Sequence, residues 1–183
     1  MSLIDTPFSK GPSASARTRS MILRVTGTAV SVCALAVANA YSSPASAAEL
    51  TRSVDVAATP AQVWSVIGPF CAIKDWHPVV GTCTEDGKTP PTRTLVTKDG
   101  KTTFVEPETA RSDHSYSYTF AASPFPVTHY TGTISVVAKG SDGATIVWHG
   151  TYTPNPGKEK EATADFAGVY ESGLAALKTR FAK

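Results

Sequence analysis

His77, which lies between Trp76 and Pro78, is the ionisable residue of this chain that we consider first as a ligand-binding or catalytic group. A proline disfavours helical geometry in the residue before it, so we expect the chain to turn at His77. An imidazole at such a turn, near the mouth of a cavity, could hydrogen-bond a ligand or act as a general base near neutral pH. The alternative interpretation is structural: Trp76 plugs the sheet and His77 caps a turn.

Two carboxylates, Glu106 and Glu108, flank Pro107 in a segment that has the pattern of a strand. Residues two apart share one face of a strand, so both side chains project the same way. We therefore favour a solvated pair over an acid and a base on opposite sides of a substrate. If Glu106 instead points into a cavity, desolvation raises its pKa, and it could serve as an acid or a polar anchor.

Aromatic residues supply the candidate binding surface. Tyr116 and Tyr118 share one strand face, as do Trp148 and Tyr152. Aromatic rings fill protein cores, but they also line ligand pockets, where an apolar body and one hydroxyl orient a guest. We expect two or three of them to reach a cavity. The predicted ligand-binding residues are Trp76, His77, Glu106, Tyr116, Tyr118, Tyr130, Trp148, Phe166 and Tyr170.

The motifs of several common chemistries are missing from the sequence. The histidines at 77, 114, 129 and 149 are scattered singly, without the HxH or HExxH spacing of a metal site. The sequence holds no nucleophile elbow, phosphate loop or dinucleotide fingerprint. We therefore expect no metal and no cofactor, and we favour a protein that is not an enzyme.

The elements that must position these residues follow from the hydrophobic pattern. The pattern predicts strands over residues 50–56, 79–84, 92–98, 102–108, 115–122, 127–138 and 144–154. Thr59 and Pro60 suit an N-cap and a first helical position, so a helix begins there and ends at Gly68-Pro69. A second short helix or turn covers residues 70–76. Apolar residues at steps of three and four between 166 and 181 predict a long amphipathic C-terminal helix.

These elements define an α+β fold. A curved antiparallel sheet of about seven strands has one face to cover, and a long amphipathic helix can cover it. Curvature leaves space between the sheet and the helix. That space is the candidate ligand cavity.

Residues 1–47 have the three parts of a secretory signal peptide. Basic residues at 10, 17, 19 and 24 precede an uncharged run from 25 to 48, and Ala45-Ser46-Ala47 is a cleavage box. Ala38-Asn39-Ala40 is a second box, and Met21 is an alternative start. An uncleaved anchor is the rival interpretation, but the run from 25 to 40 is short for a span of about 20 apolar residues. We expect a periplasmic or secreted protein with no stable membrane span after cleavage.

Residues 48–183 then form one domain of balanced charge. They contain 13 Lys and Arg against 14 Asp and Glu, with no basic patch to bind nucleic acid. Cys33 leaves with the signal peptide, so Cys71 and Cys83 remain as an even pair. Disulfides persist in an oxidising compartment, so we favour a Cys71–Cys83 bond over two free cysteines that bind a metal.

Several segments together resemble the START-like superfamily (SRPBCC), which includes the polyketide cyclase/dehydrase and lipid-transport proteins. They are TPAQVW at 59–64, FCAIKDWHP at 70–78, SYSY at 115–118, SPFPV at 123–127, Tyr130 and Val147-Trp148. The Trp-His-Pro and Ser-Pro-x-Pro-Val segments are similar to an exported bacterial branch with MxaD-like accessory proteins linked to periplasmic methanol oxidation. The resemblance implies a helix-grip fold, in which the curved sheet wraps around the long helix. It also implies a cavity for a small apolar molecule, but no defined reaction.

Three functions stand as hypotheses. We favour an exported carrier or sensor that holds a small hydrophobic molecule between the sheet and the C-terminal helix. The second is an enzyme of the polyketide cyclase, aromatase or dehydratase kind, with His77 or Glu106 as acid or base. The third is an accessory protein that docks on a periplasmic dehydrogenase or another exported partner, with an exposed apolar patch around Pro124-Phe125-Pro126.

Overall fold

The computed structural model describes residues 46–182. The predicted signal peptide lies outside the described residues except for its last two positions, so its cleavage and the alternative start at Met21 stay predictions. Within residues 46–182, no helix is both long enough and apolar enough to cross a membrane.

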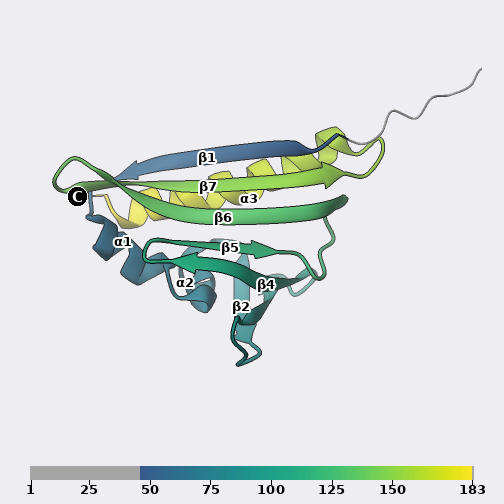
Figure 1. Cartoon of the computed structure of the whole chain (residues 1–183), viewed down its shortest axis with the longest axis horizontal. Coiled ribbons are helices and arrows are strands. Elements are labelled where there is room, and N and C mark those ends of the chain that lie inside the picture. Colours follow the sequence, from purple (N-terminus) through teal and green to yellow (C-terminus); the bar gives the residue numbers. More distant parts are fainter. Residues whose placement is uncertain (1–45, 183) are drawn as a thin grey trace, which may run out of the picture. The chain divides into compact units, whose positions relative to one another are not determined.

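The described residues form seven strands, three short helices and one long helix (Figure 1). The strands are β1 (Ala48–Val56), β2 (Val80–Glu85), β3 (Thr92–Thr97), β4 (Thr103–Ser112), β5 (Ser115–Thr119), β6 (Val127–Lys139) and β7 (Gly143–Pro154). The helices are α1 (Pro60–Ile67), the 3₁₀ helix η1 (Phe70–Ala72), α2 (Ile73–Trp76) and α3 (Glu159–Arg180). Every predicted strand is present, but β4 extends to Ser112 and β5 ends earlier than predicted, at Thr119.

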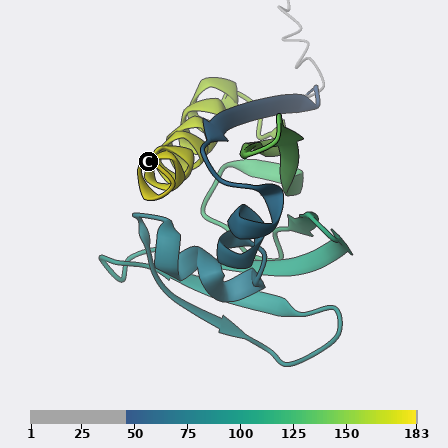
Figure 2. The same cartoon turned by 90° about the vertical axis from the view of Figure 1, so that its left-hand side faces the viewer.

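The seven strands make one antiparallel sheet in the order β1-β7-β6-β5-β4-β3-β2. Neighbours in the sheet are neighbours in the sequence, except that β1 pairs with β7. Register shifts interrupt the β2–β3, β4–β5 and β6–β7 pairings, and such bulges bend a sheet. The bent sheet lies around α3, as Figure 2 shows. The predicted α+β helix-grip fold is confirmed.

The segment between β1 and β2 holds the three short helices against the sheet. Helix α1 begins at the predicted N-cap: the Thr59 side chain accepts from the Gln62 amide, and the Gln62 side chain accepts from the Thr59 amide at 2.9 Å. Helix α1 packs on β6 and β7, and α2 packs on β2. Cys71 in η1 and Cys83 in β2 form the predicted disulfide, with their Cα atoms 5.4 Å apart. The bond ties the short helices to the edge of the sheet.

The core lies between α3 and the inward face of the sheet. Helix α3 contacts β1 and β7, and its buried stripe consists of Ala162, Phe166, Tyr170, Gly173, Leu174 and Leu177. From the sheet, Ile146 and Trp148 of β7 and Ile134 of β6 are almost completely buried. Each large apolar side chain buried in this way stabilises the fold by roughly 1.5–3 kcal/mol.

Candidate ligand-binding site

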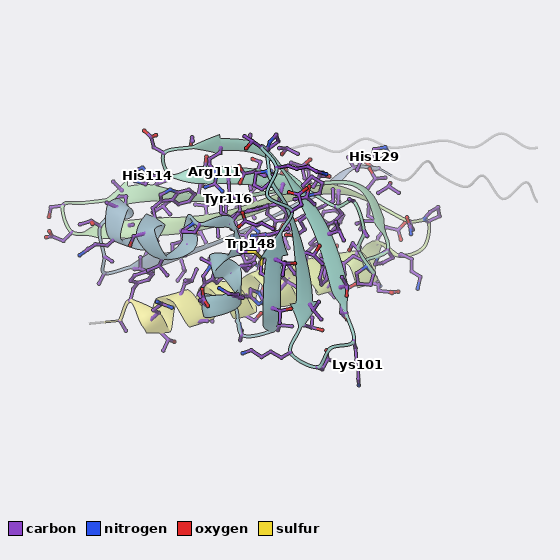
Figure 3. All side chains as sticks on the ribbon, turned by 90° about the horizontal axis from the view of Figure 1, so that it is seen from below. Lys101, Arg111, His114, Tyr116, His129 and Trp148 are labelled. Atoms are coloured by element: carbon purple, nitrogen blue, oxygen red, sulfur yellow. A yellow bond between two sulfur atoms is a disulfide. The ribbon has the colours of Figure 1, made fainter. Side chains whose placement is uncertain are left out.

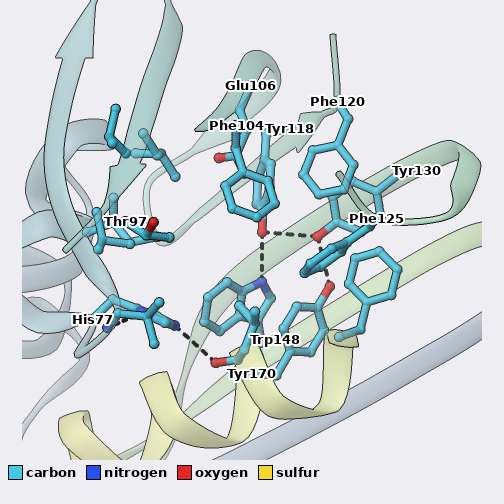
Figure 4. Close-up of a pocket in the computed structure, with 17 residues that line it drawn as sticks. His77, Thr97, Phe104, Glu106, Tyr118, Phe120, Phe125, Tyr130, Trp148 and Tyr170 are labelled. Carbon is cyan, nitrogen blue, oxygen red and sulfur yellow. Dashed lines mark hydrogen bonds between the residues drawn. The ribbon is translucent and has the colours of Figure 1, made fainter. Parts of the chain in front are cut away.

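A cavity of about 60 Å³ lies between the sheet and α3 (Figure 4). Its lining is mainly aliphatic and aromatic: Ile73, Val79, Val80, Leu95, Val96, Phe104, Phe120, Phe125, Trp148, Phe166 and Val169. Polar groups reach it from His77, Thr97, Glu106, Tyr118, Tyr130 and Tyr170. A volume of this size holds a few water molecules, and it is below the roughly 150 Å³ of an apolar cavity that accepts benzene. A ligand with a ring therefore requires the side chains to move.

A chain of hydrogen bonds joins four aromatic side chains at the cavity. Trp148 Nε1 donates to Tyr118 Oη at 3.0 Å, and Tyr130 Oη donates to the same oxygen at 3.1 Å. The hydroxyls of Tyr130 and Tyr170 are 2.9 Å apart. Burial raises the pKa of Tyr118, Tyr130 and Tyr170 above the ordinary phenol value. All three are therefore neutral hydrogen-bond donors at physiological pH.

Stacking between rings fixes this chain in place. The Trp148 ring stacks on Tyr170 with centroids 4.5 Å apart, and Tyr130 stacks on Phe166 at 4.8 Å. Tyr170 and Phe166 belong to α3, whereas Trp148 and Tyr130 belong to the sheet. The contacts therefore join the helix to the sheet at the cavity, and they leave each hydroxyl little freedom to turn.

His77 ends α2 and lies buried, with both ring nitrogens engaged. Nε2 is 3.0 Å from the carbonyl oxygen of Val169 in α3, and Nδ1 accepts from the Val79 amide at 3.3 Å. A carbonyl only accepts, so the imidazole proton is on Nε2. Burial lowers the pKa of His77, and the charges of Arg93 and Lys98 lower it further. The ring lines the cavity as a neutral group that connects α2 with α3.

Glu106 and Glu108 are both buried, so the expectation of a solvated pair is wrong. Glu106 Oε2 accepts from Arg93 Nε at 2.7 Å, and Arg93 Nη1 donates to the Phe70 carbonyl at 2.6 Å. Glu108 pairs with Arg111, which donates to the Gly68 carbonyl at 2.9 Å. Each carboxylate thus orients one arginine toward a carbonyl of the α1–η1 segment. The face that they share is covered by this segment, which the alternation of the strand alone does not reveal.

Arg93 is the charged residue that sequence reasoning missed. It is fully buried, and its guanidinium lies 4.1 Å from the centre of the Phe70 ring. Burial raises the pKa of Glu106, while Arg93 opposes that rise. The guanidinium does not lose its proton, so a neutral Glu106 would leave a buried cation without a partner. We therefore treat Glu106 as ionised near neutral pH.

The structure brings seven of the nine predicted binding residues to the cavity: His77, Glu106, Tyr118, Tyr130, Trp148, Phe166 and Tyr170. The other two lie elsewhere in the core. Tyr116 packs against Trp64 and Phe70, and Figure 3 places it beside Arg111 and His114. Trp76 packs edge-on against Trp148 at 5.8 Å, and its indole nitrogen has no hydrogen-bond partner among residues 46–182. Whether any of the seven binds a ligand stays a prediction.

Three phenylalanines of the lining were not predicted. Phe104, Phe120 and Phe125 contact one another, with Phe104 and Phe125 centroids 5.3 Å apart. Phe125 also lies edge-on to Phe166 at 5.1 Å and lines the cavity, while its side chain stays half-buried and Pro124 beside it is exposed. Pro124 and Pro126 flank Phe125, and the sequence alone does not show in which direction the Phe125 side chain points. Phe104 and Phe120, by contrast, could have been found from their places on strands that carry predicted site residues.

Comparison with known proteins now identifies the class of the protein. A family model described as polyketide cyclase / dehydrase and lipid transport matches residues 47–182. The chain therefore belongs to this family, a branch of the START-like superfamily, as its sequence motifs indicated. No protein in a curated collection matches it significantly.

Solved structures agree with this assignment. The protein XoxI of Bacillus cereus is 34% identical, with a TM-score of 0.69 over 73% of this chain and 95% of its own. A Thermobifida fusca protein is also 34% identical, with a TM-score of 0.66 over 73% and 92% of the two chains. The ZhuI aromatase/cyclase of a Streptomyces species is 13% identical, with a TM-score of 0.63 over 74% and 93%. The last likeness concerns the fold alone.

Proposed function

We propose that this chain is an exported protein that binds a small hydrophobic molecule in the cavity between the sheet and α3. The observation that carries the proposal is the cavity itself, with its aromatic walls and its few fixed polar groups. Ligand pockets combine these two features, the apolar walls supplying affinity and the polar groups orientation. Membership of a family described by polyketide cyclisation and lipid transport supports the same proposal.

The state of the ionisable groups favours binding over acid–base catalysis. A general base needs a nitrogen or oxygen free to take a proton from the substrate. Both nitrogens of His77 already make hydrogen bonds to the backbone. Glu106 keeps one oxygen, Oε1, without a hydrogen-bond partner among the described residues, but the charge of Arg93 on Oε2 disfavours the protonation that a general base must undergo. We therefore place a carrier or sensor ahead of a cyclase, although both would use the same cavity.

Export rests on the sequence of residues 1–47 together with the disulfide. Cys71 and Cys83 are bonded, and structural disulfides are typical of oxidising compartments. We therefore propose a periplasmic or secreted location, with cleavage after Ala47 or Ala40.

Native mass spectrometry of the protein purified from its own host tests these points together. We expect a reproducible extra mass under native conditions that disappears on denaturation, and its chemical identification would separate a carried molecule from a reaction product. The denatured mass reports the cleavage site and the loss of the two thiol hydrogens. A ligand-free protein that also fails to bind any added hydrophobic probe would overturn the proposed function.

A further inference from the structure

The directions of the hydrogen bonds around Tyr118 leave one proton without an acceptor. Trp148 and Tyr130 both donate to Tyr118 Oη. Since Tyr130 uses its only proton in this bond, Tyr170 must be the donor in the bond between Tyr130 and Tyr170. Tyr118 therefore accepts twice, and its own hydroxyl proton meets no acceptor within residues 46–182.

This unmatched donor belongs to the cavity. Tyr118 is only 3% exposed and lines the cavity, and Figure 4 shows its hydroxyl above Trp148, where the hydrogen bonds converge. A buried donor without an acceptor costs about 1–3 kcal/mol, and nearly all such groups in native proteins have a partner. The acceptor must therefore come from what enters the cavity: a water molecule when no ligand is bound, and an oxygen atom of the ligand when one is.

A second unmatched atom lies on the neighbouring strand. Arg93 Nε and Nη2 both approach Glu106 Oε2, at 2.7 and 2.6 Å, and no hydrogen bond among the described residues uses Oε1. The β4–β5 register pairs Glu108 with Tyr118, so Glu106 is a diagonal neighbour of Tyr118 on the same face. Both residues line the cavity. One wall of the cavity therefore offers a donor and an anionic acceptor.

On the basis of the proposed binding function, we propose that the cavity takes an uncharged, ring-sized molecule with one hydroxyl or carbonyl oxygen. That oxygen accepts the proton of Tyr118, and a ligand hydroxyl can donate in turn to Glu106 Oε1. The aliphatic and aromatic walls receive the ring. No lysine or arginine is among the residues that line the cavity, and the free oxygen of Glu106 repels a carboxylate. The site therefore selects against carboxylic acids of similar size.

Four one-ring probes test this inference on the purified protein: toluene, anisole, phenol and benzoate. Toluene has no oxygen, anisole has only an acceptor, phenol has an acceptor and a donor, and benzoate is an anion. Titrations followed by calorimetry or NMR give the dissociation constants. One added hydrogen bond predicts that anisole and phenol bind about threefold to tenfold tighter than toluene. Benzoate should bind most weakly.

A pair of matched variants locates the effect. Tyr118→Phe should change the advantage of anisole and phenol over toluene, because it removes the unmatched proton and leaves the N–H of Trp148 and the O–H of Tyr130 without their acceptor. An unchanged advantage would show that Tyr118 does not hold the oxygen of the probe. Tyr152→Phe is the control: Tyr152 is equally buried, its hydroxyl bonds to Thr163 at 3.1 Å, and it does not line the cavity. This control should keep the advantage. Because Trp148 and Tyr130 both lose their acceptor in Tyr118→Phe, that variant can be destabilised, so circular dichroism must first show that it folds. If it does not fold, the wild-type series decides alone.

The outcomes separate this inference from the function on which it rests. If toluene binds as tightly as phenol and anisole, or benzoate binds more tightly than phenol, the inference is overturned and the binding function stands. If no probe binds while native mass spectrometry finds a bound molecule, the proposed ligand class is wrong and the binding function again stands. If neither experiment finds binding, both proposals fail.

Discussion

His77 is the residue whose chemistry depends most on its surroundings. In solution its imidazole would titrate near neutral pH, but here it is enclosed by α2, α3 and the sheet. Its ring lies edge-on to Trp76 and Trp148, with centroids 5.7 and 6.0 Å away. Protonation would place a second N–H at Nδ1, directly facing the Val79 amide, which is itself a donor. The neutral ring is therefore part of the folded structure.

This enclosure predicts a loss of stability in acid. Burial lowers the pKa of His77 in the folded protein, so the unfolded chain binds the proton first, near its ordinary value of about 6.5. The contribution of the neutral His77 ring to the free energy of unfolding is complete above that pH. It is lost as the pH falls toward the folded pKa, and the loss is at most about 1.4 kcal/mol for each pH unit. Urea unfolding of the wild type and of His77→Gln between pH 7.5 and 5 measures it. The variant should show the weaker pH dependence; equal slopes would contradict the prediction.

Gly173 lies where His77 and Trp148 meet α3. A Cβ built on Gly173 would be 2.7 Å from His77 Cδ2 and 2.9 Å from Trp148 Cζ3, whereas one on Gly168 of the same helix meets nothing within 4 Å. Gly173→Ala should lower the free energy of unfolding by roughly 1 kcal/mol, because overpacking outweighs the gain in helix propensity. Gly168→Ala, the matched control, should raise it by about 0.5–1 kcal/mol. Chemical denaturation measures both; a stabilised Gly173→Ala would show that the rings can yield.

Two arginine–glutamate pairs connect β3 and β4 with the short helices. The buried pair between Arg93 and Glu106 bridges directly paired residues of neighbouring strands, and Arg93 then reaches the Phe70 carbonyl in η1. The Glu108–Arg111 pair is partly open to solvent, since the Arg111 side chain is 37% exposed. Screening by water makes a pair of this second kind worth little. The Arg93 pair should therefore matter most to the fold.

Breaking the buried pair from one side tests this difference. Arg93→Met should destabilise the protein by about 3–5 kcal/mol, because it leaves the Glu106 carboxylate buried without a partner. The double variant Arg93→Met with Glu106→Leu should recover part of that loss, since no charge remains buried. Arg111→Met serves as the comparison and should cost less than Arg93→Met, because Arg111 is 37% exposed and its truncation lets water reach the Glu108 carboxylate. Equal losses for the two single variants, measured by urea unfolding, would contradict the assignment.

The elements themselves could be predicted from the sequence because their signals are local. The alternation in β1 and β7, the Thr59-Pro60 start of α1 and the stripe of α3 each depend on neighbours a few residues apart. The environment of Glu106 depends on Arg93, thirteen residues away on another strand, and on Phe70 in η1. No periodicity within one segment records such a contact. The same reason explains why Tyr116 was expected at the cavity but packs under α1.

The cavity between the sheet and α3 is small for the molecule that it is proposed to bind. Its volume of about 60 Å³ is small for a ligand with a ring, and eleven apolar side chains define its walls. One of them, Phe125, lies in the connection between β5 and β6 and is only half-buried. A side chain in a loop moves at lower cost than one in the packed sheet or helix. We expect the cavity to enlarge at this wall when a ligand enters.

Replacing Phe125 by alanine should therefore improve the binding of a larger probe. We take N-phenyl-1-naphthylamine, a neutral dye that fluoresces in apolar surroundings. Burying roughly 50 Å² more of its surface, at about 25 cal/mol per Å², corresponds to about tenfold tighter binding to Phe125→Ala than to the wild type.

Phe181→Ala is the control, because Phe181 packs against the core and does not line the cavity. The two variants remove the same side chain, so a general loosening of the fold would raise affinity in both. A gain confined to Phe125→Ala would mean that the cavity is the binding site and that its volume limits the ligand. Equal gains would mean that the dye binds elsewhere and that the cavity is not its binding site.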